Sequence, residues 1–414
     1  MELLVRMGHW SLERWYRLFG CILISIIGLL SSGCWDQHEL ENRRFVLAIA
    51  IDRADQGLGP EEKEATRVET FVQPYGDKRY RLSFQILDIT PAENIINGPK
   101  GKIATYVISN TGQSMFEMLR DMLGQSDRPF WFEHLQAIII SEAAARQAGG
   151  VQPMIDLFRR DPEMRWLTKT LITSGEARSL LEYQPPSGEP SGIFIASSLQ
   201  LYKKNTHVPT WRTDIGDLTR STDNNSRVLM ARIELVDNIV KLGGMGLFKQ
   251  GKFIGYVDEY ATQGGKFILG IEKSAIITAQ CPEHPGKILA FELFRHNTKL
   301  TPHLHGEKIY FTLDITMWGN LGETQCGRQH DTMDAGEIHK IETVVAEEVK
   351  ENVLYSVHVN QELQVDAISF GAKLKAHEPL VWEKVKDRWD DEVFPTVSLL
   401  VSVNVTIENI GEHK

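Results

Sequence analysis

Phe45-Val-Leu-Ala-Ile-Ala-Ile-Asp52 places a buried strand at the start of the first folded region of this chain. It is a short, continuous apolar run, the pattern of a strand that lies inside a sheet. Leu135-Gln-Ala-Ile-Ile-Ile-Ser141 has the same character farther along the chain. Two such strands require neighbours that pair with them and helices that cover them, and the flanking sequence supplies both.

Strands and helices alternate around these two runs. Further strands are predicted at 67–72, 81–89 and 166–173, and helices at 112–123, 142–147 and 151–159. This alternation favours an α/β region with a mixed sheet. The segment Gln184-Pro-Pro-Ser-Gly-Glu-Pro-Ser-Gly192 has five Pro or Gly in nine residues, so it predicts a linker at the end of that region.

The sequence beyond the linker predicts a small, sheet-rich middle region. An amphipathic helix at 193–202 and a polar loop at 213–226 precede strands at 228–236, 246–248 and 253–257. Lys249-Gln250-Gly251-Lys252 has the composition of a hairpin turn between the last two strands.

The final region is predicted to be α+β. Strands at 274–278, 289–294 and 309–318 precede a long helix at 335–357, whose apolar stripe comprises Ile338, Ile341, Val345, Val349 and Val353. From Val397 to Ile407 apolar residues alternate strictly with others, the best strand signal in the chain. We therefore expect a mixed α/β and α+β body of three domains, 34–190, 191–270 and 271–414.

The first 34 residues have the layout of an export signal. A basic head with three arginines precedes thirteen mostly apolar residues (18–30), and Ser31-Ser32-Gly33 follows directly before Cys34. A positive head, a short apolar run and a small-residue exit are typical of a cleaved signal peptide. A Cys at this position predicts a bacterial lipoprotein, in which residues 1–33 are removed and a diacylglyceryl group is joined to the sulfur of Cys34.

Two other interpretations of this segment remain open. A transmembrane anchor requires about 20 apolar residues, and residues 28–33 extend the run only at some cost. An ordinary secretory signal with an incidental Cys fits the same layout. If the lipoprotein interpretation holds, two acyl chains give stable anchoring, whereas one chain gives only marginal binding.

Composition restricts the partners of the exported body. The chain is 42% hydrophobic and 24% charged, as is normal for a globular protein. Its formal net charge is −10, and because the signal carries three Arg and two Glu, the body after residue 33 is near −11. An acidic body is repelled by nucleic acid and by anionic lipid headgroups, so neither is an expected partner.

The four cysteines have different expected roles. Cys21 leaves with the signal, and Cys34 carries the lipid. Cys281 and Cys326 remain, and an exported protein can join such a pair in a disulfide. A body of this size does not need the bond for stability, so the sequence leaves the pairing open.

Motifs of catalysis are missing from the sequence. It contains no GxSxG elbow, P-loop, HExxH or GxGxxG. Residues of the types that bind zinc occur at Cys281, His284, His303 and His305. Their spacing matches no standard site, so unrelated loop histidines are the better explanation. His134 follows Glu133 but has no nucleophile at readable spacing, which favours a structural role. We expect no enzyme.

A dense charge cluster follows the helix predicted at 151–159. It runs Arg159-Arg160-Asp161-Pro162-Glu163-Met164-Arg165. A solvated network of ion pairs is the usual outcome for such a cluster. A fixed polar surface on which a partner protein docks is the alternative.

These stretches together resemble the Ger(x)C family of spore germination lipoproteins. The resemblance covers nearly the whole body after residue 33 and includes Gly33-Cys34-Trp35-Asp36 with Glu39, Ile49-Ala50-Ile51-Asp52, Gly112-Gln113-Ser114, His134-Leu-Gln-Ala-Ile-Ile-Ile-Ser-Glu142, Phe158-Arg-Arg-Asp-Pro-Glu-Met-Arg165, Gly246-Leu-Phe-Lys-Gln-Gly-Lys-Phe-Ile-Gly255, Asp366-Ala-Ile-Ser-Phe-Gly371, Pro379, Trp382, Trp389 and the terminal strand. Each piece alone is weak, but their order and spread make the match specific.

The resemblance implies a non-enzymatic subunit of three mixed α/β domains. It implies the C subunit of a nutrient germinant receptor, which acts with polytopic A and B subunits and is lipid-anchored at the outer face of the spore inner membrane. Cys34 is the one residue whose role carries over, as the lipid attachment site. Two alternatives from other classes are a lipid-anchored small-molecule binding protein and, less favoured, a metal hydrolase that uses Cys281, His284, His303 and His305.

Overall fold

A computed structural model describes most of the chain. The described residues are 15, 17, 19–23, 43–56, 79–88, 105–201, 207–209, 213–223, 227–272, 274–325 and 335–409. The chain divides into one unit of residues 1–43 and a second of residues 44–414. In the first unit residues 19–23 are helical. None of the helices among the described residues is both long enough and apolar enough to span a bilayer. Cys34, Cys326 and the strand predicted at 67–72 lie outside the described residues.

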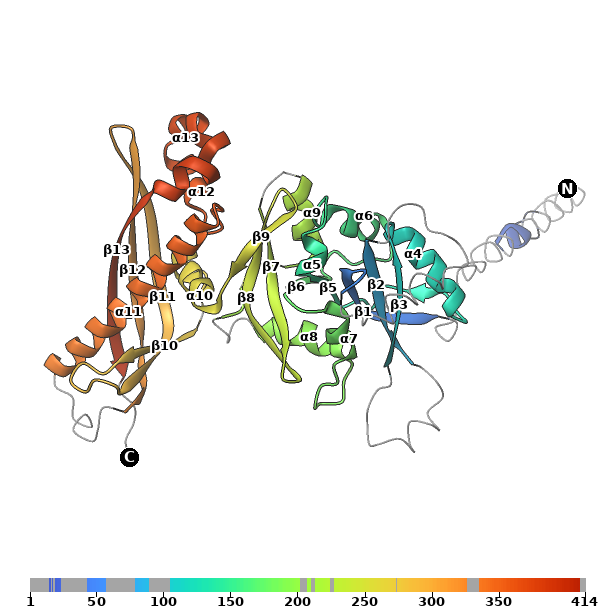
Figure 1. Cartoon of the computed structure of the whole chain (residues 1–414), viewed down its shortest axis with the longest axis horizontal. Helices are drawn as coiled ribbons and strands as arrows, with labels where there is room; N and C mark the ends of the chain where they lie inside the picture. Colours follow the sequence, from blue (N-terminus) through green and yellow to red (C-terminus); the bar gives the residue numbers. More distant parts are fainter. Residues whose placement is uncertain are drawn as a thin grey trace, which may run out of the picture. The chain divides into compact units, whose positions relative to one another are not determined.

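A nine-stranded mixed sheet is built from the first two predicted regions (Figure 1). Its order is β3-β2-β1-β5-β6-β7-β8-β9, and β4 also pairs with β1. β1, β5, β6 and β7 are parallel neighbours, and antiparallel strands flank them on each side. The bounds are β1 Arg44–Arg53, β2 Tyr80–Leu87, β3 Thr105–Gly112, β4 Phe130–Trp131, β5 Ala137–Ser141, β6 Lys169–Thr173, β7 Arg227–Val236, β8 Ile239–Lys249 and β9 Lys252–Val257.

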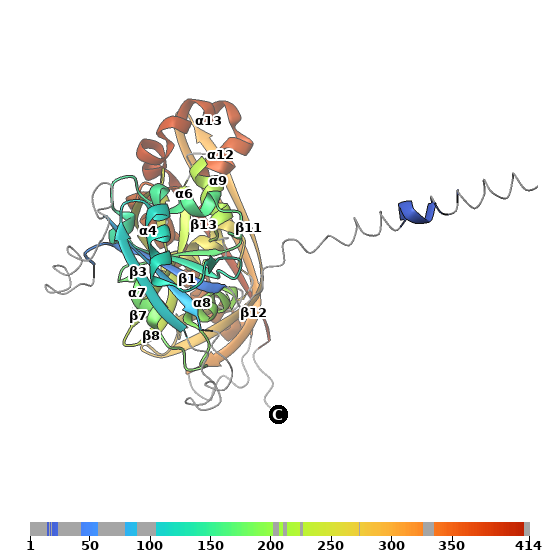
Figure 2. The same ribbon diagram turned by 90° about the vertical axis from the view of Figure 1, so that its right-hand side faces the viewer.

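Helices cover both faces of this sheet. α6 and α9 lie on one side of β1, and α7 and α8 lie on the other (Figures 1 and 2). α4 and α5 bury side chains in the same core as α6 and α9. The bounds are α4 Met115–Met122, α5 Glu142–Ala145, α6 Gln152–Arg160, α7 Ala177–Glu182, α8 Ser191–Gln200 and α9 Ile215–Asp223. This arrangement explains why the quoted runs are apolar without alternation, since both faces of β1 and β5 are buried.

Small residues set how closely the second helical layer approaches. Ala48 and Ala50 of β1 belong to the core under α7 and α8. A Cβ at Gly192 of α8 would come within 2.8 Å of the Cβ of Ala48. This close approach explains why alanines interrupt the larger apolar residues of Phe45–Asp52, because only a small side chain leaves room for the backbone of α8.

The structure corrects one prediction in the middle region. Residues 215–223, predicted as part of a polar loop, form α9, because Asp214 accepts a hydrogen bond from the backbone N–H of Asp217 and Ile215 and Leu218 reach the core. Strands β7 to β9 continue the sheet begun by β1. The hairpin at Gln250-Gly251 is confirmed, with φ of 53° and 76°. The division at 34–190, 191–270 and 271–414 stays a prediction.

A second, four-stranded sheet has the order β10-β11-β12-β13 (Figure 1). Its bounds are β10 Ala275–Gln280, β11 Ile288–His305, β12 Lys308–Thr324 and β13 Ser398–Asn409. β13 lies parallel to β12, so the chain crosses over between them through α11 Ala335–Glu362, α12 Phe370–His377 and α13 Pro379–Val385. α11 buries the predicted stripe from Ile341 to Val353 against one face of the sheet. The expected mixed α+β fold is confirmed.

α10 Glu259–Leu269 follows the first sheet and was not predicted. Asp258 caps its start by accepting a hydrogen bond from Ala261 N, and Gly270 ends it at a φ of 69°. A Cβ at Gly264 would lie 2.3 Å from the backbone oxygen of Asn352 on α11, so the two helices are in backbone contact. Buried Thr262, Gln263 and Lys266 interrupt the apolar pattern that would have revealed this helix.

Candidate functional site

Polar side chains gather where the parallel strands of the first sheet end. Asp52 lies at the end of β1, Ser141 ends β5, Thr173 ends β6 and Glu234 lies near the end of β7. The carboxyl edge of parallel strands is the usual ligand-binding edge of α/β proteins. It is therefore the first place to look for a site.

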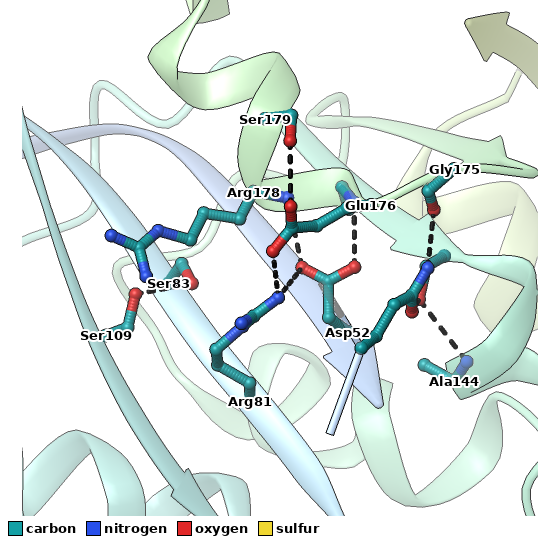
Figure 3. A network of polar contacts seen from close by, with 12 residues as sticks. Asp52, Arg81, Ser83, Ser109, Ala144, Gly175, Glu176, Arg178 and Ser179 are labelled. Carbon is teal, nitrogen blue, oxygen red and sulfur yellow. Dashed lines mark hydrogen bonds and ion pairs between the residues drawn. The ribbon is translucent and has the colours of Figure 1, made fainter. Parts of the chain in front are cut away.

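Asp52 is fully buried at this edge and serves as a cap for α7 (Figure 3). Its carboxylate accepts hydrogen bonds from Ala177 N (2.7 Å) and Arg178 N (3.0 Å). The buried guanidinium of Arg81 lies 3.6 Å away and also pairs with Glu176. Burial raises the pKa of Asp52, and the backbone donors and Arg81 oppose that shift only in part.

Gln56 extends the network toward β5. Its amide donates to Gly175 O (2.9 Å) and accepts from Ser141 Oγ (2.8 Å). Ser141 in turn accepts from Ala144 N and so caps α5. The carboxyl edge is thus filled by the chain's own side chains, which fasten α5 and α7 to the sheet.

Asp366 has the same function in the second half of the chain. It is fully buried and accepts from Phe370 N (3.0 Å), Gly371 N (2.6 Å) and the indole Nε1 of Trp389 (3.1 Å). Arg227 of β7 lies 3.6 Å from the same carboxylate. Burial raises the pKa of Asp366, with Arg227 the main opposing influence. Asp366 therefore links the start of α12 to an arginine of the first sheet.

A buried ion pair lies at the end of α10. Lys266 Nζ and Glu272 Oε2 are 2.8 Å apart with both side chains at 0% exposure, and Lys266 also donates to Val208 O (3.3 Å). Burial lowers the pKa of Lys266, against the attraction of Glu272. Burying an ion pair removes the hydration of both charges, and this cost offsets most of their attraction, so the pair adds little net stability. The pair does join three segments, 207–209, α10 and 271–272, in one arrangement.

Those segments form much of the wall of a cavity of about 590 Å³. α11 and β10 complete it, and its lining residues are His207, Tyr260, Gln263, Phe267, Ser274, Ala275, Ile276, Ile277, Thr278, Glu348, Val349 and Asn352. Tyr260 donates its hydroxyl hydrogen to Glu348 (2.9 Å). Gln263 is buried, and within the described part of the chain its Nε2 has no hydrogen-bond partner.

The cysteines and histidines singled out in the sequence do not form a metal site in the described residues. Cys281 is disulfide-bonded, and His284 Nδ1 lies 3.6 Å from its sulfur. His303 stacks on Tyr310 and hydrogen-bonds Thr312 instead. Among the residues that the structure describes, no three potential ligands come together. The hydrolase alternative is left without its proposed ligands.

The remaining candidates have structural contacts. His134 packs edge-on against Phe45, with ring centroids 5.2 Å apart. In the charge cluster Arg160 pairs with Asp156 (2.8 Å), and Glu163 accepts from Phe132 N. The exposed Arg160–Asp156 pair is of the kind that the network interpretation predicts, whereas Glu163 anchors the loop after α6 to Phe132.

Comparison with known families accounts for almost the entire body. A family described as "Spore germination protein N-terminal domain" matches residues 36–235, and "Spore germination B3/ GerAC like, C-terminal" matches residues 243–411. The chain belongs to the Ger(x)C family of spore germination proteins. The resemblance inferred from the sequence motifs is confirmed, and with it a role in germination.

Individual Ger(x)C relatives are similar over their full length. Spore germination protein YndF of Bacillus subtilis (strain 168) is 25% identical over 95% of this chain and 96% of its own length. Spore germination protein B3 of the same organism is 22% identical over 92% and 94%. The crystal structure of the GerBC protein has the same fold, with a TM-score of 0.57 and 18% identity over 82% of this chain and 100% of that one.

Several Ger(x)C motifs have structural contacts that explain their residues. Asp366 and Trp389 are hydrogen-bonded to each other, and a Cβ at Gly371 would lie within 2.8 Å of Trp382 and Trp389. The motif 366–371 and the two tryptophans therefore form one packed unit. Lys266, Glu272 and Gln263 were missed, because a buried ion pair and an isolated amide carry no periodic signal in sequence.

Proposed function

We propose that this Ger(x)C protein is the lipid-anchored C subunit of a nutrient germinant receptor. The observation that carries the proposal is that the two family domains occupy 36–235 and 243–411, directly after the lipoprotein-type exit at Gly33-Cys34. In this proposal the mature chain begins at Cys34. Acyl chains, palmitate among them, hold it at the outer face of the spore inner membrane.

The subunit acts by contact rather than by catalysis. Its proposed partners are the polytopic A and B subunits, with which it supports nutrient-triggered germination. The interior is compatible with this role, because Asp52 and Asp366 each fasten the start of a helix to the rest of the body. A body charge near −11 keeps it off anionic headgroups, so direct attachment to the bilayer comes from the lipid.

Replacement of the anchor cysteine tests the proposal. A Cys34→Ala variant should lose membrane retention and respond poorly to nutrients, because no acyl chain can be attached. Fractionation of spores and the loss of optical density on germination measure the two effects. Cys21→Ala is the matched control, since Cys21 lies in the removed signal. Normal membrane retention together with normal germination of the Cys34→Ala strain would refute the proposal.

Copurification tests the partner assignment separately. Affinity-purified full-length protein from spores should bring down two polytopic membrane proteins encoded beside it. Their absence under conditions that retain the lipid-anchored chain would count against the receptor assignment. Full germination to all nutrients in a deletion strain would exclude a non-redundant role.

A further inference from the structure

β10 is an edge strand without the usual protection. Among the described strands it pairs with β11 alone. Its sequence, Ala275-Ile-Ile-Thr-Ala-Gln280, contains no charge and no proline, and Ile276 is 54% exposed. Edge strands normally carry lysine, proline or a bulge that prevents another strand from adding. The edge of β10 therefore remains able to pair.

The 590 Å³ cavity runs along this edge. Five consecutive residues, 274–278, line it. They alternate between the buried face (Ala275, Ile277) and the exposed face (Ile276, Thr278), so the cavity borders the strand at its side rather than on either face. In a strand with one neighbour, the backbone groups of alternate residues point away from that neighbour.

The part of the wall formed by α10 offers a side-chain amide. Gln263 of α10 lines the cavity, and its buried Nε2 has no partner among the described residues. An extended backbone has donors and acceptors along both of its edges. A strand lying in this cavity can bond to the unpaired edge of β10, and its backbone also offers an acceptor for the amide of Gln263.

The acidic wall of the cavity favours an extended segment that carries a positive charge. Glu348 lies in the wall, where it accepts the hydroxyl hydrogen of Tyr260 (2.9 Å). Among the residues that the structure describes, the lining of the cavity includes no lysine or arginine. A basic side chain on the incoming segment can form an ion pair with the Glu348 carboxylate and lie against the ring of Tyr260, and both contacts favour a cation.

We propose that β10 and this cavity receive an extended segment of a partner polypeptide, with a basic side chain opposite Glu348, as an added strand. The inference rests on the proposed function only in that it supplies a contact surface for a receptor partner. The Lys266–Glu272 pair prepares the site, because it fixes the segments on either side of the cavity before the partner arrives.

A peptide-binding measurement on full-length protein in detergent micelles tests this. The probe is a fluorescent capped peptide, acetyl-Thr-Val-Lys-Val-Arg-Val-Thr-amide, read by anisotropy against empty micelles. We expect saturable binding and slower amide hydrogen exchange in residues 275–280. The same peptide with glutamate for both basic residues should bind at least about tenfold more weakly. A version with proline at alternate positions should not bind, because it lacks backbone donors.

Paired variants locate the site. Ile276→Lys should weaken binding at least about tenfold, because a lysine on the edge blocks strand addition. Leu400→Lys is the control, since Leu400 is 61% exposed on β13 at the other edge of the sheet. Glu348→Gln should reduce the preference for the basic over the acidic peptide, whereas Glu347→Gln on the exposed side of α11 should not.

Three outcomes would overturn the proposal. The first is equal binding by the wild type and the Ile276→Lys variant. The second is binding of phenylalaninamide, a small amine with a carbonyl group, without any binding of the peptide, which would make the cavity a small-molecule site. The third is sedimentation showing that the protein forms a dimer that Ile276→Lys disperses, which would make a second copy the occupant. None of these bears on membrane anchoring, so the proposed receptor role is tested independently.

Discussion

Asp52 and Asp366 are two buried aspartates that perform one task in different surroundings. Each accepts two backbone N–H groups at the start of a helix and faces an arginine 3.6 Å away. Asp52 shares its arginine with Glu176, and its contacts stay within one sheet and its helices. Asp366 adds the Trp389 indole and takes its arginine from β7, a strand of the other sheet. Asp366 therefore makes more side-chain contacts than Asp52, and these contacts reach residues of both halves of the chain.

The largest expected effect comes from removing the carboxylate with more connections. Asp366→Ala leaves two N–H groups, the Trp389 indole and Arg227 without their acceptor, so it should lower the free energy of unfolding by about 3–5 kcal/mol. Urea unfolding of the purified protein measures this. Asp387→Ala, at an exposed aspartate two residues before Trp389, is the control and should change stability by less than about 0.5 kcal/mol. If both variants lost the same free energy of unfolding, the buried contacts of Asp366 would contribute no more to stability than an exposed aspartate does.

Gly371, in the same motif, tests whether close packing also stabilises the unit around Asp366. Gly371→Ala should destabilise by about 1–3 kcal/mol, because the added methyl lies within 2.8 Å of both Trp382 and Trp389. Gly124→Ala is the matched control, since a methyl added there would meet nothing within 4 Å. Thermal unfolding of both variants gives the difference. A Gly371→Ala protein as stable as the control would mean that the tryptophans move aside freely.

Asp52→Asn should have the smallest effect, and one that depends on pH. The amide keeps an acceptor oxygen for α7, so a loss of about 1–2 kcal/mol is expected in acid. Burial raises the pKa of Asp52 above its ordinary 3.8, so between that value and its raised pKa the folded protein binds a proton that the unfolded chain releases. The contribution of Asp52 to the free energy of unfolding of the wild type therefore falls as the pH rises through that window. The Asp52→Asn variant shows no such fall, because asparagine does not ionise.

The gap in stability between the wild type and Asp52→Asn should consequently narrow as the pH rises above 3.8. Urea unfolding of both proteins across that range checks the direction. A gap that widens with pH would show that the folded state favours the charged carboxylate. In that case Arg81 and the backbone donors outweigh burial at Asp52, and the two aspartates would differ in charge state as well as in connections.

Sequence periodicity predicted the parts of the fold whose burial follows a simple period. The continuous runs around Ile49 and Ile139, the stripe from Ile341 to Val353 and the alternation after Val397 all lie where they were expected. α10 and α9 were missed for opposite reasons. α10 buries polar side chains that break the stripe, and α9 reaches the core with only Ile215 and Leu218 inside a polar stretch.

The candidate site was less accessible to sequence reasoning. Its parts come from α10, β10 and α11, and what joins them is the Lys266–Glu272 pair, formed across the end of α10. A lysine and a glutamate six residues apart have no signature of burial in a sequence that is 24% charged. The same applies to Arg81, whose burial depends on Asp52 and Glu176 from two other elements.

The parallel pairing of β13 with β12 has a consequence for when this protein can fold. β13 is the last strand of the described chain, and more than seventy residues separate it from β12. Contacts this distant in sequence form slowly. The second sheet therefore cannot be completed until β13 has been made, and α11, which packs on that sheet, precedes β13 in the chain. A chain cut short before β13 leaves that edge exposed to aggregation.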